Sequence, residues 1–308
     1  MKQETFFVDS AFDGTRLHAL LLTPEDEPLG LVQFCHGMAE YKERYLPFME
    51  WLCEKGFACL IHDHRGHGQS VGCAEDLGYF GPRGDEAVIE DTHQLTLWLR
   101  ERFPGLPLTL FGHSMGSLIV RCYLQKYDAD LDALVVSGCV SQNPAGPAGL
   151  FLVKMLEKLK GERHRSAFIA KMTFGSYNKN FLDAVSPNAW LNSDPAPVAA
   201  YDADPLCGFT FTLNGYKALF GLIIDCYRKD GWAMKNPDLP IHFVSGADDP
   251  CLTNEEKFKE AAAFLRERGY RNVTARLFEG MRHEVLNEPE HEKVWKEVEE
   301  KLKIKDPA

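Results

Sequence analysis

The chain has 308 residues, of which 45% are hydrophobic and 26% are charged, a composition typical of a globular protein. Its formal net charge of −11 argues against nucleic-acid binding and against docking on anionic lipid, because both need a basic face. No apolar run is long enough to span a bilayer, and the residues after Met1 lack the apolar core of a signal peptide.

The first 138 residues alternate between predicted strands and predicted helices. The predicted strands cover residues 5–10, 16–23, 30–35, 57–62, 108–111 and 133–137, and the predicted helices cover 45–55, 85–103 and the run after Ser114 to Tyr127. Strands that alternate with helices favour a mostly parallel sheet. Ligands of such sheets bind beyond the carboxyl ends of the strands.

This alternation stops between residues 139 and 238. Helical patterns occur at 150–159 and 216–227, and the segment 186–204 is rich in Pro, Asp and Ala. The alternation then resumes, with strands at 241–245 and 273–278 and helices at 254–268 and 290–303. We therefore predict an α/β core of residues 1–138 and 239–308, with residues 139–238 inserted over its top as a helical cap.

The segment LTLFGHSMGS, residues 108–117, predicts a strand, a sharp turn and a helix with Ser114 at the tip. The pattern G-x-S-x-G in this context is typical of a nucleophile elbow. A side chain at Gly112 or Gly116 would collide with the neighbouring strand and helix, so both positions require glycine. The helix N-terminus points at the serine, where its dipole favours the negative charge of acyl transfer.

A nucleophilic serine needs a base, and the base needs an orienting acid. In this architecture the acid and then the histidine follow the serine in the chain. His283 follows the last predicted strand and is the predicted base. The acid is Asp248 or Asp249, which both follow the strand at 241–245, and Cys251 nearby is either a modifiable thiol or a filler of a tight loop.

Two backbone N–H groups are expected to bind the oxyanion. One belongs to Met115, the residue after the nucleophile, and the other to Met38 in the loop after the strand at 30–35. The run from His62 to His67, HDHRGH, is similar to dizinc hydrolase motifs, but Gly66 stands where those have Asp. We therefore predict no metal and no cofactor, and interpret this run as a structural loop beside the site.

Four motifs in order resemble the monoacylglycerol lipase and lysophospholipase branch of the α/β-hydrolases, also called serine aminopeptidase S33 or hydrolase-4. They are HGMAEYKERY at 36–45, DHRGHG at 63–68, GHSMG at 112–116 and RHEVLNE at 282–288. The resemblance implies an α/β-hydrolase fold with about eight strands and a helical cap. It also implies hydrolysis of carboxylic esters by Ser114, Asp249 and His283, because Gly-x-x-Asp-Pro is the pattern expected for the acid. Met38 and Met115 would then form the oxyanion hole.

The expected substrates are monoacylglycerol-like, lysophospholipid-like or other short- and medium-chain acyl esters. Gly37 and His113 are expected to contact the substrate, and Phe151 and Met155 to line an acyl tunnel above Ser114. Two alternatives stay open: a peptidase or amidase on the same triad, and a non-catalytic binding protein. An aminopeptidase needs acidic groups for the substrate amine, and Asp194, Asp202 and Asp204 are the candidates.

The expected partner is a small acyl ester rather than a nucleic acid or a membrane anchor. The sequence leaves the oligomeric state open. Nine cysteines in an irregular arrangement indicate reduced thiols, so we expect a cytoplasmic protein.

Overall fold

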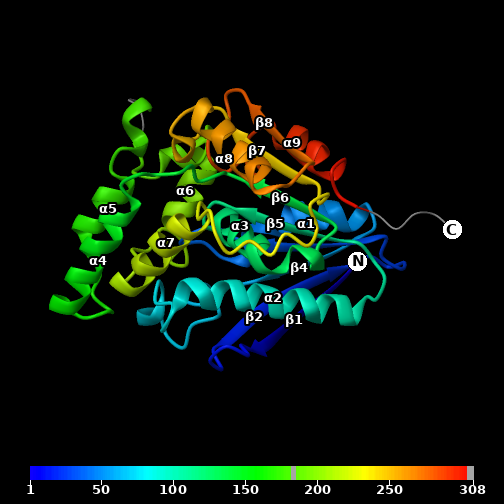
Figure 1. Ribbon diagram of the computed structural model, residues 1–308, viewed down its shortest axis with the longest axis horizontal. Coiled ribbons are helices and arrows are strands. Elements are labelled where there is room, and N and C mark those ends of the chain that lie inside the picture. Colours follow the sequence, from blue (N-terminus) through cyan, green and yellow to red (C-terminus); the bar gives the residue numbers. More distant parts are fainter. Residues whose placement is uncertain (182–184, 304–308) are drawn as a thin grey trace.

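The computed structural model describes residues 1–181 and 185–303, and its centre is an eight-stranded sheet (Figure 1). The strand order is β1-β2-β4-β3-β5-β6-β7-β8. β2 is antiparallel to both β1 and β4, and every other pair is parallel, which confirms the predicted mostly parallel α/β sheet. The bounds are β1 Lys2–Asp9, β2 Arg16–Thr23, β3 Gly30–Cys35, β4 Phe57–His62, β5 Leu108–His113, β6 Ala133–Ser137, β7 Ile241–Gly246 and β8 Val273–Phe278.

Helices cover both faces of this sheet. Strands β3, β4, β5 and β6 are buried along their whole length, as expected for strands with helices on both sides, whereas the edge strand β1 is mostly exposed. Helices α1 and α9 pack on one face, and α2, α3 and α8 pack on the other. Their bounds are α1 Leu46–Glu54, α2 Gly84–Arg102, α3 Met115–Tyr127, α8 Glu255–Arg268 and α9 His291–Glu299.

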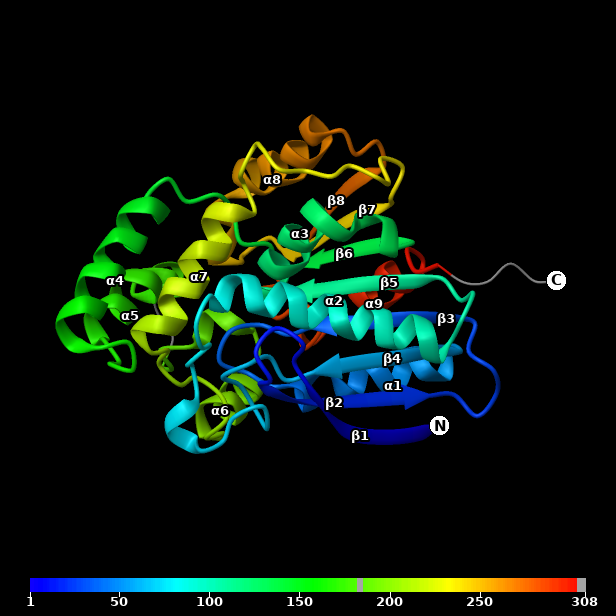
Figure 2. The same cartoon turned by 60° about the horizontal axis from the view of Figure 1, so that its bottom comes forward.

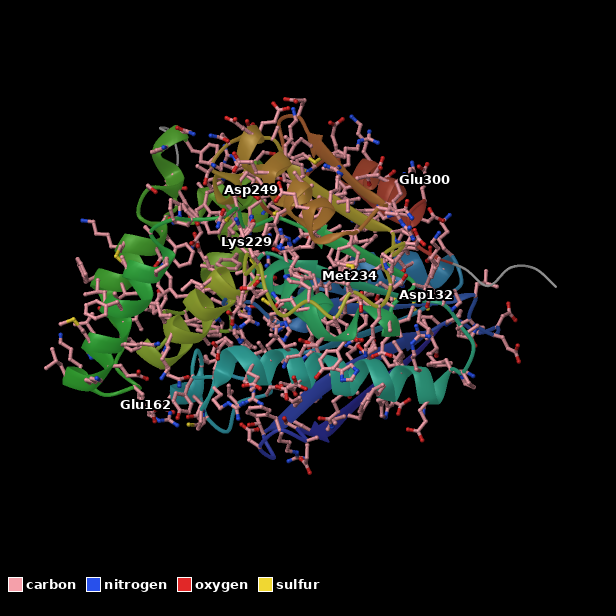
Figure 3. All side chains as sticks on the ribbon, in the orientation of Figure 1. Asp132, Glu162, Lys229, Met234, Asp249 and Glu300 are labelled. Carbon is pink, nitrogen blue, oxygen red and sulfur yellow. The ribbon has the colours of Figure 1, made fainter. Side chains whose placement is uncertain are left out.

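The parallel register brings the loops of the predicted site to one edge of the sheet. Cys35 of β3 pairs with Gly112 of β5, and His113 of β5 pairs with Ser137 of β6. The loops that follow these strands therefore leave the sheet side by side. In Figure 3, Asp249, just after β7, and Asp132, just before β6, are labelled toward opposite ends of the sheet.

Four helices between β6 and β7 lie beyond the ends to which β4 and β5 point (Figure 2). They are α4 Gly146–Lys160, α5 Ala167–Phe174, α6 Pro195–Ala203 and α7 Leu213–Asp225. α4 and α7 agree with the predicted helices, whereas α5 and α6 were not expected. α7 contributes to the same apolar cluster as α2 and α3, so the division into core and cap at residues 139 and 238 stays a prediction. No described helix is long and apolar enough to cross a membrane.

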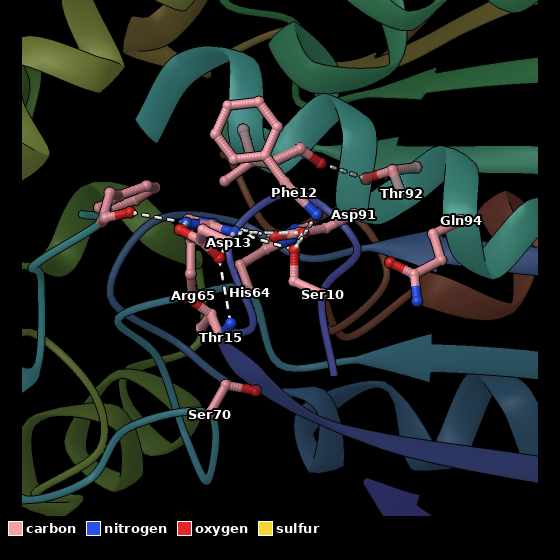
Figure 4. A network of polar contacts seen from close by, with 12 residues as sticks. Ser10, Phe12, Asp13, Thr15, His64, Arg65, Ser70, Asp91, Thr92 and Gln94 are labelled. Carbon is pink, nitrogen blue, oxygen red and sulfur yellow. Dashed lines mark hydrogen bonds and ion pairs between the residues drawn. The ribbon is translucent and has the colours of Figure 1, made fainter. Parts of the chain in front are cut away.

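The loop after β4 is fixed by a buried ionic network. Arg65 is almost fully buried and donates from Nε to Asp91 (2.9 Å) and from Nη1 to Asp13 (2.7 Å), as Figure 4 shows. In the same loop, Asp63 accepts a hydrogen bond from the buried ammonium of Lys42 at 2.7 Å. Buried charges persist only when they are paired, so these residues have a structural role.

Histidines of this loop support the turn that follows β3. Nε2 of His67 accepts the backbone N–H of Ala39 at 3.2 Å, and Nε2 of His36 accepts the backbone N–H of His64 at 2.9 Å. Within residues 1–181 and 185–303, this loop contains no group of three side chains close enough to share a metal ion. The contacts of Arg65, Asp63, His36 and His67 hold this loop against its neighbours, and the absence of a metal from it stays a prediction.

Candidate active site

Ser114 sits at a strained turn between β5 and α3. Its backbone angles, φ of 56° and ψ of −117°, lie in a region that residues other than glycine rarely adopt. This conformation costs on the order of 1–3 kcal/mol. A Cβ added at Gly112 would lie 2.4 Å from the carbonyl oxygen of Gly116, and one added at Gly116 would lie 2.0 Å from that of Cys35. Both glycines are therefore required by close backbone approach, as the sequence predicts.

The structure pairs His283 with Asp249. Nδ1 of His283 donates to Oδ2 of Asp249 at 2.8 Å, and the two residues are only 2% and 4% exposed. Asp248 is exposed instead. Burial alone would lower the pKa of His283, but Asp249 and Cys251 beside it together outweigh burial and raise that pKa well above its usual value. An imidazolium formed during a reaction would thus be stabilised here.

The other ring nitrogen of His283 is available. Nε2 is buried and has no hydrogen-bond partner among the described residues. The imidazole is enclosed by the rings of His113 and Trp190, whose centroids lie 4.7 and 4.9 Å from its own. Ser114 and His283 line the same cavity, and no hydrogen bond joins them in the described structure, which is common before a substrate binds. Their catalytic roles stay predictions.

In the turn after β3, the backbone N–H groups on both sides of Met38 are used by other contacts. The N–H of Gly37 donates to Oε1 of Glu40 at 2.6 Å, and the N–H of Ala39 donates to His67. Between them, the N–H of Met38 has no acceptor in the described structure, and neither does that of Met115 at the start of α3. These are the two donors that the sequence assigns to the oxyanion, and both residues line the cavity.

A buried ionic bridge joins the two loops that carry these groups. Arg44 donates to Glu40 (2.6 Å) beside the turn after β3, and to both carboxylate oxygens of Glu284 (2.7 and 2.8 Å), the residue after His283. Burial raises the pKa of Glu40, and the Glu284 carboxylate adds to the rise while Arg44 opposes it. The bridge therefore sets the position of the turn after β3 relative to His283.

Helix α6 and the residues on either side of it are tied to the same loops. The hydroxyl of Tyr201 on α6 donates to the carbonyl of Ala39 at 2.9 Å, and the hydroxyl of Tyr41 donates to Asp204 at 2.7 Å. The backbone N–H of Glu284 donates to the carbonyl of Leu191 at 2.8 Å. The segment from Trp190 to Asp204 is thus fixed to the core on both sides of the cavity.

The cavity above Ser114 has a volume of about 480 Å³. Gly37 and His113 line it, as expected. A Cβ at Gly37 would lie 3.1 Å from Cβ of Ser114, so glycine keeps the approach to the serine open. Apolar side chains from α3, α5, α7 and the adjacent loops supply much of its wall: Leu118, Val140, Phe174, Phe209, Leu219 and Ile223.

The expectation that Phe151 and Met155 line the cavity is corrected by the structure. Their side chains are 66% and 46% exposed on the outer side of α4, and neither borders the cavity. Val153 faces the core from the same helix, because Gly146 and Gly149 let α4 pack closely on α7. Helix α5, rather than the predicted helix at 150–159, lies beside the cavity.

An aromatic wall was missed by sequence reasoning. The rings of Phe174, Tyr177 and Trp190 pack together, with centroids 4.9 Å apart between Tyr177 and Trp190, and all three border the cavity. A local signal existed for α5, because Ser166 caps this helix by accepting the N–H of Ile169. No local pattern indicates that Trp190 covers His283.

Comparison with known proteins gives consistent relatives over nearly the whole chain. The family model Hydrolase_4, described as serine aminopeptidase, S33, matches residues 26–290. The monoacylglycerol lipase of Mycolicibacterium smegmatis is 29% identical over 289 residues, which cover 92% of each chain. The human monoglyceride lipase is 25% identical over 296 residues, which cover 91% of this chain and 86% of the human one.

The solved structures agree. A thermostable carboxyl esterase from Bacillus coagulans, in complex with glycerol, superposes with a TM-score of 0.87 at 26% identity and covers 98% of this chain and 99% of its own. A potato epoxide hydrolase superposes with a TM-score of 0.63 at 19% identity, a likeness of fold alone. Fold class and family resemblance are thereby confirmed, and the chain belongs to the serine aminopeptidase S33 (Hydrolase_4) family, in the monoacylglycerol lipase-like branch of the α/β-hydrolases.

Proposed function

We propose that this carboxylic ester hydrolase cleaves monoacylglycerol-like or other short- and medium-chain acyl esters through an acyl-enzyme on Ser114. The observation that carries the proposal is the buried pair of Asp249 and His283, which leaves Nε2 unoccupied in the cavity that Ser114 also lines. Two unoccupied backbone N–H groups border the same cavity. A nucleophile, an oriented base and two donors are the parts that acyl transfer needs.

The reaction follows from these positions. Oγ of Ser114 attacks the ester carbonyl while Nε2 of His283 accepts its proton, and Asp249 stabilises the resulting imidazolium. The N–H groups of Met38 and Met115 bind the oxyanion of the tetrahedral intermediate. His283 then gives the proton to the leaving alcohol. In the second half of the reaction, His283 accepts a proton from the water molecule that attacks the acyl-enzyme, and returns it to Oγ of Ser114 as the acid leaves.

Charged side chains of both signs border the cavity. Glu40 and Glu284 are both bound to the guanidinium of Arg44, and Lys171 on α5 is a further lining residue that carries a positive charge. Charge at the cavity therefore sets no preference between a monoacylglycerol-like and a lysophospholipid-like ester.

The three acidic residues that a peptidase would need to bind the substrate amine are engaged elsewhere. Asp194 caps α6, Asp202 accepts hydrogen bonds from Ser186 and Asn188, and Asp204 accepts one from Tyr41. None of these three carboxylates borders the cavity as described. An ester substrate, which has no amine to bind, agrees with this arrangement.

The test is replacement of the nucleophile. Ser114→Ala should lower kcat for a monoacylglycerol or p-nitrophenyl ester by a factor on the order of 10⁴ or more, because triad members act as a unit. It should also abolish labelling by a fluorophosphonate probe, while the circular dichroism spectrum stays unchanged. Near-normal turnover by this variant, or faster turnover of aminoacyl anilides than of esters by the wild type, would reject the proposal.

A further inference from the structure

Cys251 brings a third metal-binding side chain to the pair of Asp249 and His283. One ligand atom from each residue lies within 4.8 Å of the other two, and all three residues are buried. No other such group of three exists within residues 1–181 and 185–303. Ester hydrolysis as proposed above makes no use of the Cys251 thiol.

The position of this thiol is fixed by the turn after β7. The backbone N–H of Cys251 donates to Oδ1 of Asp249 at 2.8 Å, and its carbonyl accepts the N–H of Ser141 at 3.1 Å. Cys251 is the one cysteine of nine that borders the cavity, and all nine lie in the described residues. The thiol is thus held beside Asp249 and His283 by its own backbone.

Thiolate, imidazole and carboxylate together form a ligand set that suits Zn²⁺. In a tetrahedral site with Zn–S near 2.3 Å and Zn–N or Zn–O near 2.1 Å, ligand atoms stand roughly 3.3 to 3.6 Å apart. The ligand atoms of Asp249, Cys251 and His283, within 4.8 Å of one another, stand little farther apart than this spacing. The cavity beside Cys251 and His283 supplies the fourth, open position.

We propose that Asp249, Cys251 and His283 form an inhibitory site for Zn²⁺ or a similar thiophilic divalent cation. The proposal rests on the proposed function, because its consequence is loss of the catalytic base. Binding replaces the proton of the Cys251 thiol, which is released to solvent, and the metal takes Nδ1 of His283. The proton that Nδ1 donates to Asp249 is displaced by the metal and moves to Nε2, so the imidazole is neutral, and Nε2 then cannot accept the proton of Ser114.

Cys73 provides the matched control. It is the exposed cysteine of the chain, and its Sγ lies 3.4 Å from the carboxylate of Asp76. It would therefore be the first thiol to bind a metal ion non-specifically. Cys73→Ser removes that thiol without touching the cavity, whereas Cys251→Ser and Cys251→Ala remove the proposed ligand.

The experiment uses the full-length protein after treatment with a chelator and a non-chelating phosphine reductant. Co²⁺ is titrated first, since its thiolate charge-transfer absorption reports a cobalt–sulfur bond without any need for activity. We expect one equivalent to produce this absorption in the wild type and in Cys73→Ser, and no such absorption in either Cys251 variant. Inhibition of ester turnover by Zn²⁺ should require at least about tenfold more metal in the Cys251 variants.

The outcomes separate this proposal from the proposed function. An absorption that persists in the Cys251 variants, or that disappears in Cys73→Ser, would overturn the metal site. Equal Zn²⁺ inhibition of wild type and Cys251→Ser would overturn it as well. If the metal-free protein fails to react with a fluorophosphonate while Co²⁺ still binds through Cys251, the proposed function fails and the metal site stands.

Discussion

Two adjacent carboxylates after β7 carry the same charge in opposite surroundings. Asp249 is 4% exposed and accepts hydrogen bonds from His283 and from the backbone of Cys251. Asp248 is exposed to solvent, where a carboxylate interacts weakly with its neighbours. The pattern of the sequence places both residues at the end of a strand. Which of them reaches the histidine depends on how the chain turns there.

These surroundings predict a large difference between two conservative variants. Asp249→Asn should lower kcat by a factor on the order of 10⁴, because an amide favours the wrong tautomer of His283. Asp248→Asn should change kcat by less than about twofold, since it removes only a solvated charge. Steady-state kinetics on the ester substrate measures both, and the reverse ranking would assign the acid to Asp248.

At the scale of elements, the ionic bridge couples two loops that are 240 residues apart in the chain. Arg44 precedes α1, Glu40 belongs to the turn after β3, and Glu284 follows His283. Residues in one such network act together, so damage at one loop reaches the other. The sequence shows all three residues but no pattern that pairs them.

Removal of the guanidinium tests this coupling. Arg44→Met leaves two buried carboxylates unpaired and should lower the free energy of unfolding by about 3–5 kcal/mol. In the protein that remains folded, kcat should fall more than KM rises, because the bridge fixes the position of the turn after β3 relative to His283. Arg83→Met, which breaks an exposed ion pair with Glu86, is the control and should change neither. An unchanged kcat in folded Arg44→Met would limit the bridge to a structural role.

The helices between β6 and β7 could be predicted only in part from the sequence. Spacing of apolar residues gives the presence of α4 and α7, because that pattern is local. α4 is apolar on several sides, however, so its pattern cannot tell which side meets the core. Close packing through Gly149 against Phe220 decides this, and it turns Phe151 outward. Such tertiary contacts have no signature in a single segment.

The cavity wall predicts how acyl chain length affects turnover. Each buried methylene of the substrate adds roughly 0.8 kcal/mol of binding, so kcat/KM should rise from acetate toward medium-chain esters. Leu219→Phe on α7 fills part of the cavity and should shift the best substrate to a shorter chain. Phe151→Ser on the exposed side of α4 should leave the profile unchanged. A wild-type profile that is highest for acetate would contradict an acyl cavity.

At the scale of the whole molecule, the sheet and the elbow could be predicted because their determinants are local. Buried strands appear as apolar runs, and Gly112, Ser114 and Gly116 specify a turn by steric exclusion. The proposed oxyanion donors could be assigned to a loop, but no pattern in the sequence shows a reason for the N–H of Met38 to lack an acceptor while those of Gly37 and Ala39 have one. That reason lies in contacts of Gly37 with Glu40 and of Ala39 with His67.

Four buried histidines make the fold sensitive to acid. Desolvation lowers the pKa of His36 and His64 well below the usual value, that of His62 to about 3, and that of His67 to about 4. All four stay neutral in the folded state, while in the unfolded chain they bind protons near pH 6.5. The unfolded state therefore gains protons first, and stability falls as pH drops below about 6.5.

The expected loss is large. At pH 5.5 His62 and His67, whose folded pKa values are about 3 and about 4, together cost about 3 kcal/mol, and His36 and His64 add to this loss. The raised pKa of His283 adds stability that is fully present below pH 6.5 and is lost as pH rises through that raised pKa, so it does not change the slope between pH 6.5 and 5.5. Urea denaturation at pH 7.5, 6.5 and 5.5 measures the slope. A free energy of unfolding that is constant over this range would show that the histidines are not kept neutral.

The distribution of thiols has a consequence for optical experiments. Eight cysteines are buried and Cys73 alone is exposed, so a maleimide fluorophore attaches at one position without mutagenesis. Next to that position, Asp76 binds Arg163, and the carbonyls of Glu75 and Leu77 accept hydrogen bonds from Arg165, both between α4 and α5. A dye on Cys73 therefore sits beside the segment between α4 and α5. Its emission would follow, in real time, any movement of that segment away from Asp76 during turnover of an ester.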